Sequence, residues 1–283
     1  MGETMKPGRP KDDFDSLQNP AKSSSSHVFW YEVRRIVAKG KGVFQDVVTC
    51  PPVLFGAGNC LLAYQTAEPL GIVINVLTSL VAASCRIYES WTGIQKGLPY
   101  YVAAAVNLAT SLSVIYNGFH VQGINGAYSF NERARMSLLS ATAFAGWGIG
   151  HILKGLHDAK QTPPRSVLDD EQLYYGIGDV AALQGLLVPS IPSLFGIVRA
   201  FHKKTDIPQS GKPLWKVAIK NATSARFYAA GFFLGSISAI AANPLFSLAQ
   251  VLWGSAYICM EKNENRQLLS DFRKLISRYF YSK

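Results

Sequence analysis

Six long windows of this chain contain no Asp, Glu, Lys or Arg, and the charged residues are crowded into the segments between them. The windows are residues 47–67, 69–85, 97–131, 136–153, 180–198 and 227–260. A helix needs about 20 apolar residues to cross the hydrocarbon core of a bilayer, which is about 30 Å thick. The pattern therefore predicts an all-α fold, a polytopic transmembrane helical bundle of about six to eight membrane segments.

The charge content supports a membrane protein more than a soluble one. Charged residues make up 16% of the chain, whereas soluble domains contain roughly 25%. A net charge of +10 would suit nucleic acid, but in a membrane protein it indicates basic loops that face the cytoplasm and anionic lipid. We therefore expect the lipid bilayer and its anionic headgroups as partners and no nucleic acid. The sequence leaves oligomerisation open.

Both ends of the chain are polar and basic. Residues 1–27 include four successive serines together with Pro, Lys and Asp, a composition that predicts a disordered tail. Residues 28–46 and 261–283 combine a helical apolar stripe with a basic face, which predicts an amphipathic interfacial helix at each end of the transmembrane domain, residues 47–260. Such a stripe can equally pack on a soluble partner or on the chain's own loops.

The distribution of Lys and Arg predicts that both termini are cytoplasmic. A single span over residues 174–202 conflicts with this topology, because it would place the most basic internal loop outside. Pro189 and Pro192 interrupt the segment, and proline inside a helix removes a hydrogen bond and kinks the backbone. We therefore predict a broken or re-entrant pair of short helices, with the two prolines as its hinge.

Polar residues inside the apolar windows are the candidates for function, since in hydrocarbon each must find a partner or face water. Asp179 stands directly before the window 180–198, where a carboxylate could accept a proton or a cation. Three amide side chains are predicted to contact a small solute or ion together with it: Gln184, Asn75 and Asn107. The alternatives are that Asp179 only caps a helix beginning at Val180 and that the amides only join helices.

Signatures of enzymes and metal sites are missing from the sequence. It contains no GxSxG, HExxH or GxxxxGK[ST] motif, and its four cysteines form no CxxC pair. The spacing of His151 and His157 does not place both imidazoles on one helical face, so we expect neither a metal nor a cofactor. We predict an integral membrane protein that binds or transports a small solute or ion through a midplane polar site near the broken helix, and the sequence leaves enzyme activity open. The alternative is a non-catalytic scaffold or effector that recruits lipids or partner proteins through its basic amphipathic ends.

Overall fold

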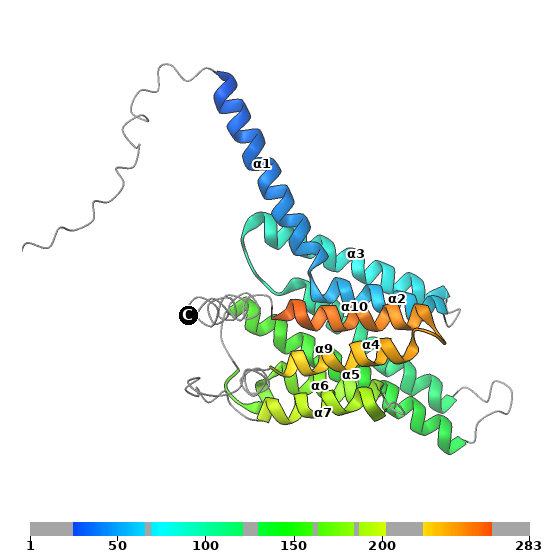
Figure 1. Cartoon of the computed structure of the whole chain (residues 1–283). Helices are drawn as coiled ribbons and strands as arrows, with labels where there is room; N and C mark the ends of the chain where they lie inside the picture. Colours follow the sequence, from blue (N-terminus) through cyan, green and yellow to red (C-terminus); the bar gives the residue numbers. More distant parts are fainter. Residues whose placement is uncertain are drawn as a thin grey trace, which may run out of the picture. The chain divides into compact units, whose positions relative to one another are not determined.

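The computed structural model describes residues 25–65, 69–120, 130–160, 164–183, 187–201 and 223–261. Every regular element in these ranges is a helix, which confirms the all-α prediction. The helices are α1 (Ser25–Val48), α2 (Pro51–Gln65), α3 (Pro69–Thr92), α4 (Leu98–His120), α5 (Phe130–Lys160), the 3-10 helix η2 (Val167–Asp169), α6 (Glu171–Ala182), α7 (Leu187–Phe201), α9 (Ser224–Ala239) and α10 (Pro244–Met260) (Figure 1). Most of the predicted tail, Gln184 and residues 262–283 of the predicted C-terminal helix lie outside the described residues.

The chain divides into two compact units, residues 1–42 and residues 43–283. In the first unit, the described part of α1 exposes the large apolar side chains of Phe29, Trp30 and Tyr31. It also carries Arg34 and Arg35. This part of α1 therefore presents both apolar and basic side chains, the combination expected of an interfacial helix.

Local sequence signals explain where several helices of the second unit begin. Proline is the first residue of α2, α3 and α10, a position where its missing N–H costs nothing. Asn243 caps α10 by accepting a hydrogen bond from the backbone N–H of Phe246 at 3.0 Å. Asp170 caps α6 in the same way, through the N–H of Gln172 at 2.8 Å.

The helices of the second unit pack in the order in which they occur in the chain. From α2 to α7, each helix packs on the one that follows it. α7 then packs on α9, α9 packs on α10, and α10 packs on α2. Figure 1 shows α2 and α10 side by side. Neighbours joined by short connections run antiparallel, so the helix ends alternate between the two ends of a closed bundle.

Charged side chains gather at one end of this bundle, which we call the charged end. It contains the C-terminal ends of α3, α5, α7 and α10 and the N-terminal ends of α2, α4, α6 and α9. Its basic residues in the described ranges are Arg86, Lys96, Lys154, Lys160, Arg165, Arg199 and Arg226. At the opposite end, Arg133 and Arg135 occur in the first turns of α5. The basic residues are therefore distributed unequally between the two ends.

The structure supports fewer membrane spans than the sequence predicts. By length and composition, α3 and residues 98–116 of α4 could each cross a membrane, and the bent pair of α1 and α2 could supply a third span. The six to eight spans are thus not confirmed. One reason is helix length: α2, α6, α7, α9 and α10 contain 12 to 17 residues, or about 18 to 26 Å at 1.5 Å per residue. Apolar windows of sufficient length are divided between shorter helices.

Candidate functional site

Asp179 lies inside α6 and is completely buried, with 0% of its surface exposed. Its Oδ1 accepts two hydrogen bonds, from Nε1 of Trp147 at 2.9 Å and from the hydroxyl of Tyr257 at 2.8 Å. Its Oδ2 has no hydrogen-bond partner in the described part of the chain. The interpretation of Asp179 as an N-cap is wrong, because α6 begins at Glu171 and Asp170 is its cap.

Two glycines bring the tryptophan to the carboxylate. A Cβ added to Gly146 of α5 would lie 2.8 Å from the backbone nitrogen of Gly178 in α6. A Cβ on Gly178 would lie 2.6 Å from Cδ1 of Trp147. Small residues at a helix interface allow this close approach. Since Trp147 follows Gly146 and Asp179 follows Gly178, the same contact sets the donor beside the acceptor.

Aromatic side chains enclose the carboxylate on the side of the charged end. The rings of Tyr175 and Tyr257 pack edge to face with centroids 5.8 Å apart, and Phe55 packs edge-on against Tyr257 at 5.2 Å. The hydroxyl of Tyr175 shares a hydrogen bond with Nδ1 of the buried His151 at 2.8 Å. Asp179 is thus held in an interior of aromatic rings and a few polar groups.

Further buried polar atoms lie unsatisfied in the same bundle. Both amide atoms of Gln250 in α10 and the hydroxyl of Ser193 in α7 have no hydrogen-bond partner among the described residues. Gln250 is seven residues before Tyr257, so the two side chains lie on the same face of α10. Unpaired buried polar groups are rare in folded proteins. The interior of the bundle therefore contains polar atoms that are available to a ligand or to water.

The other predicted site residues do not gather at Asp179. Asn75 is half-buried in α3 and donates from Nδ2 to the carbonyl of Gly71 at 2.8 Å, within its own helix. Asn107 is buried in α4, which packs mainly against α3 and α5, whereas α6 packs against α5, α7 and α9. Neither amide bonds to Asp179. Gln184 lies outside the described residues.

The predicted hinge prolines lie beyond the break between α6 and α7. The last residue described after α6 is Leu183, and α7 begins at Leu187. Pro189 therefore occupies the first turn of α7, where proline is tolerated, and Pro192 lies inside the helix.

Sequence reasoning missed both donors to Asp179. Trp147 and Tyr257 lie in apolar windows, and a search restricted to Asp, Asn and Gln passes over them. Yet a buried indole N–H or phenol O–H needs a partner as much as an amide does. Counting the aromatic donors among the polar residues of each window would have included both.

Several polar groups at the charged end form ion pairs. No group of three His, Cys, Asp or Glu side chains suited to a metal occurs in the ranges that the structure describes. His157, which lies beyond the apolar part of α5, contacts Oε2 of Glu171 through Nδ1 at 2.7 Å. This hydrogen bond raises the pKa of His157. Burial raises the pKa of Asp170, in the connection before α6, to about 6.

Comparison with known proteins adds no assignment, because no protein-family model, no curated protein and no solved structure matches this chain.

Proposed function

We propose that this chain is an integral membrane protein whose bundle, residues 47–260, lies in the bilayer. The support is an inverted distribution of polarity. Large aliphatic side chains are exposed on several helices, including Leu70 of α3, Val188 of α7 and Ile237 of α9. Asp179 and Gln250 are completely buried. Soluble proteins rarely expose apolar patches of this extent, whereas a helical bundle in lipid turns its polar residues inward.

The same proposal extends to the number of segments and their direction. The closed antiparallel order of α2 to α10 supports about six to eight membrane segments, with the shorter helices accommodated by thinning of the bilayer. The excess of Lys and Arg at the charged end supports a cytoplasmic position for that end and, with it, for both termini. Extraction of membranes with alkaline carbonate tests integration, since a peripheral protein is released and an integral one is retained.

The function we propose is the binding, and the passage, of a small solute or ion at Asp179. One observation carries this proposal: a completely buried carboxyl whose Oδ1 accepts two hydrogen bonds while its Oδ2 accepts none among the described residues. Trp147 and Tyr257 fix the orientation of the group, and the second oxygen is left for a proton, a cation or a hydrogen-bond donor on a solute. Ionisable groups inside membrane segments commonly mark ion or solute pathways.

Trp147 supplies the means to test this proposal. Its indole N–H contacts Asp179, so a ligand or proton on the carboxyl should change its fluorescence. We would titrate the detergent-purified protein with protons, monovalent cations and a panel of small solutes. The chain has five tryptophans, so subtracting the fluorescence of W147F removes the contribution of the other four. D179N should abolish the Trp147 response, and D169N, a matched change in the η2 turn, should keep it. A response that persists in D179N would contradict the proposed site.

A second candidate function rests on the surface of α1. Its exposed aromatic residues Phe29 and Trp30 lie near Arg34 and Arg35, which supports a scaffold or effector that recruits anionic lipid or a partner through this helix. The double variant F29S/W30S should then abolish recruitment of a co-sedimenting partner or lipid and leave the Trp147 response intact. The reverse outcome would favour the solute site.

A further inference from the structure

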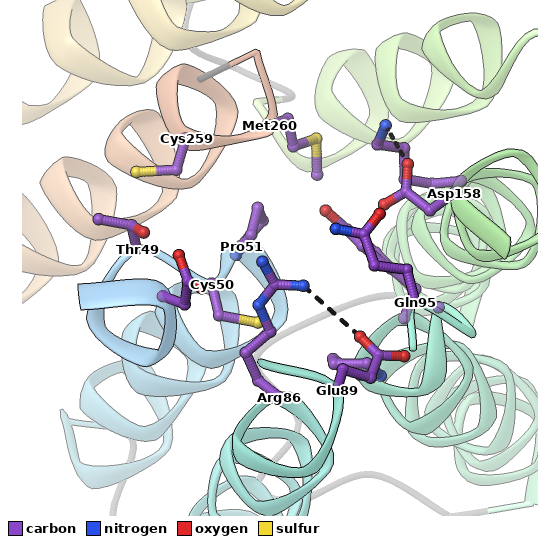
Figure 2. A pocket seen from close by; sticks show the side chains of 14 residues that line it. Thr49, Cys50, Pro51, Arg86, Glu89, Gln95, Asp158, Cys259 and Met260 are labelled. Carbon is purple, nitrogen blue, oxygen red and sulfur yellow. Dashed lines mark hydrogen bonds and ion pairs between the residues drawn. The ribbon is translucent and has the colours of Figure 1, made fainter. Parts of the chain in front are cut away.

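A cavity opens at the charged end of the bundle. It has a volume of about 360 Å³ and is lined mainly by the ends of α2, α3, α4, α5 and α10 (Figure 2). Arg86, Gln95, Lys154 and Asp158 contribute polar side chains to its lining, and Tyr100 also lies in its wall. A cavity of this size with several polar partners can hold water. Tyr100 is therefore the place where water at the charged end meets the aromatic interior of the bundle.

Tyr100 joins the cavity to a buried imidazole. Its ring packs against that of His151 in α5, with centroids 6.0 Å apart. His151 is 1% exposed, and its Nδ1 shares a hydrogen bond with the hydroxyl of Tyr175 in α6 at 2.8 Å. An imidazole has two ring nitrogens, so it can accept a proton at one of them while it releases a proton from the other. Nδ1 contacts Tyr175, which leaves Nε2 to receive a proton that arrives from the cavity.

Two phenol groups lie between this imidazole and the carboxylate of Asp179. Tyr175 precedes Asp179 by four residues, so both side chains lie on the same face of α6. The ring of Tyr175 packs edge to face on that of Tyr257, with centroids 5.8 Å apart. The hydroxyl of Tyr257 donates to Oδ1 of Asp179 at 2.8 Å. His151, Tyr175 and Tyr257 therefore follow one another from the cavity to the carboxylate, and we call these three residues the polar line.

Other titratable side chains that face the polar line have partners of their own. The ring of Tyr228 in α9 packs against Tyr257 with centroids 5.4 Å apart, but its hydroxyl donates to a backbone carbonyl of α6 at 2.5 Å. At the charged end, Asp158 pairs with Lys154 at 2.8 Å, and Glu171 contacts a histidine of α5 at 2.7 Å. The connection from the cavity to the carboxylate therefore consists of one imidazole and two phenols.

We propose that Asp179 takes a proton, and that this proton enters from the cavity and travels along the polar line. The inference rests on the proposed site at Asp179 and names both its ligand and the route by which the ligand arrives. Chains of ionisable and hydroxyl side chains are the usual proton relays inside membrane proteins.

Each step of the transfer conserves protons. Water in the cavity gives a proton to Nε2 of His151, and Nδ1 releases its own proton to the hydroxyl oxygen of Tyr175. The former hydroxyl proton of Tyr175 moves to the hydroxyl oxygen of Tyr257, directly after rotation or through one bridging water. Tyr257 then releases its proton to Oδ1 of Asp179, and each phenol keeps one proton. The net change is one proton lost by the water of the cavity and one gained by the carboxylate, which becomes neutral.

The rate at which Trp147 reports a pH jump tests this route. The full-length protein in detergent is combined with a photoacid, which releases protons on a light pulse, and Trp147 fluorescence is followed from microseconds to seconds. Y175F removes one hydroxyl from the polar line and leaves Trp147, Asp179 and Tyr257 in place. We expect Y175F to slow the response at least about tenfold and to keep its final amplitude, because the carboxyl and its two donors are unchanged.

A second variant and a matched control separate proton transfer from packing. H151N gives Tyr175 an amide as hydrogen-bond partner, but an amide does not exchange protons between two atoms as an imidazole does, so H151N should slow the response like Y175F. Y228F removes a buried hydroxyl beside the same rings and outside the polar line, and it should respond at the parent rate. The melting temperature of each variant is compared with that of the parent. If Y175F does not fold, H151N carries the test.

A change in the cavity tests the point of entry. Gln95 is exposed and lines the cavity, as Figure 2 shows, whereas its exposed neighbour Ile94 does not belong to the lining. Q95W should displace water from the cavity and slow the response, and I94W should leave the rate unchanged. Equal rates in Q95W and I94W would overturn entry from the charged end.

The outcomes distinguish the route from the site at Asp179. A pH response that is lost in D179N and slowed in both Y175F and H151N supports the site and the route. A response that is lost in D179N but has the parent rate in Y175F and H151N overturns the route and leaves the site. A parent protein whose Trp147 responds to a solute or cation and not to pH refutes the proton. A pH response that persists in D179N contradicts the site, and the route falls with it.

Discussion

Gly97 and Gly93 form a matched pair that tests how tightly the charged end is packed. Both glycines have positive φ, 68° at Gly97 and 73° at Gly93, and both lie in the connection between α3 and α4. A Cβ on Gly93 would meet nothing within 4 Å, whereas one on Gly97 would lie 2.3 Å from the carbonyl oxygen of Gly155 and 2.7 Å from its Cα. The two substitutions to alanine therefore share the cost of backbone strain and differ in the steric clash.

The expected magnitudes follow from these contacts. A residue with a side chain costs about 1 to 2 kcal/mol in the left-handed conformation, so G93A should lower the free energy of unfolding by about that amount. G97A adds the overpacking of α4 against α5, typically about 1 to 3 kcal/mol and here against backbone that cannot rotate away. The total for G97A is about 2 to 5 kcal/mol.

The assay is equilibrium unfolding of both variants in mixed detergent micelles, followed by circular dichroism, with the thermal midpoint as a second measure. G97A should unfold at a clearly lower denaturant concentration than G93A. Equal midpoints would refute the close approach of the α4 start to Gly155, and with it the wall that Gly97 contributes to the cavity beside Lys154 and Asp158.

Three further predictions concern the polar groups of the bundle. The pKa of His157 is raised in the folded protein. The stability that His157 contributes is therefore fully present below its unfolded pKa of about 6.5 and is lost as the pH rises through its folded pKa. H157Q should flatten the pH dependence of the melting temperature in that interval, and an unchanged profile would contradict the role of the Glu171 contact. Y257F removes one of the two donors to Asp179 and should cost about 1 to 3 kcal/mol, measured by unfolding in detergent; a neutral effect would show that the hydroxyl bond contributes nothing. Q250M removes both unpaired amide atoms and should leave the melting temperature equal or higher, unless Gln250 itself binds a ligand, in which case the variant loses the Trp147 response.

The sequence was sufficient to predict the helical class and to single out Asp179 among the acidic residues. It was not sufficient where contacts between helices determine which side chains meet. An absence of charge over 20 residues predicts a helix in lipid, but it does not show how far each helix extends, and α6 and α7 contain only 12 and 15 residues. Asn75 is polar in an apolar window, which predicts a solute contact, and in the structure its Nδ2 donates to the carbonyl of Gly71 in the same helix. Sequence periodicity cannot separate these two uses of an amide.

The contact of Trp147 with Asp179 was equally out of reach from the sequence. It depends on Gly146 and Gly178 facing each other across two helices whose rotation is set by the whole bundle. Each glycine alone indicates only that another backbone comes close. The pairing of the two, and therefore the placement of the donor, is a property of the tertiary structure.

If the proposed site at Asp179 takes an ion, its position in the bundle favours a proton. Asp179 follows Glu171 by eight residues, which places it about 12 Å along α6 from the charged end. Between them lies the aromatic layer of His151, Tyr175 and Tyr257, and Tyr100, which lines the cavity, lies against His151 with ring centroids 6.0 Å apart. A metal cation with its hydration shell would have to part these rings, whereas a proton needs only hydroxyl and imidazole groups such as the hydrogen-bonded Tyr175 and His151. We therefore expect the Trp147 fluorescence to respond to pH and not to Na⁺ or K⁺ at constant pH. A sodium or potassium response lost in D179N would show instead that the aromatic layer opens.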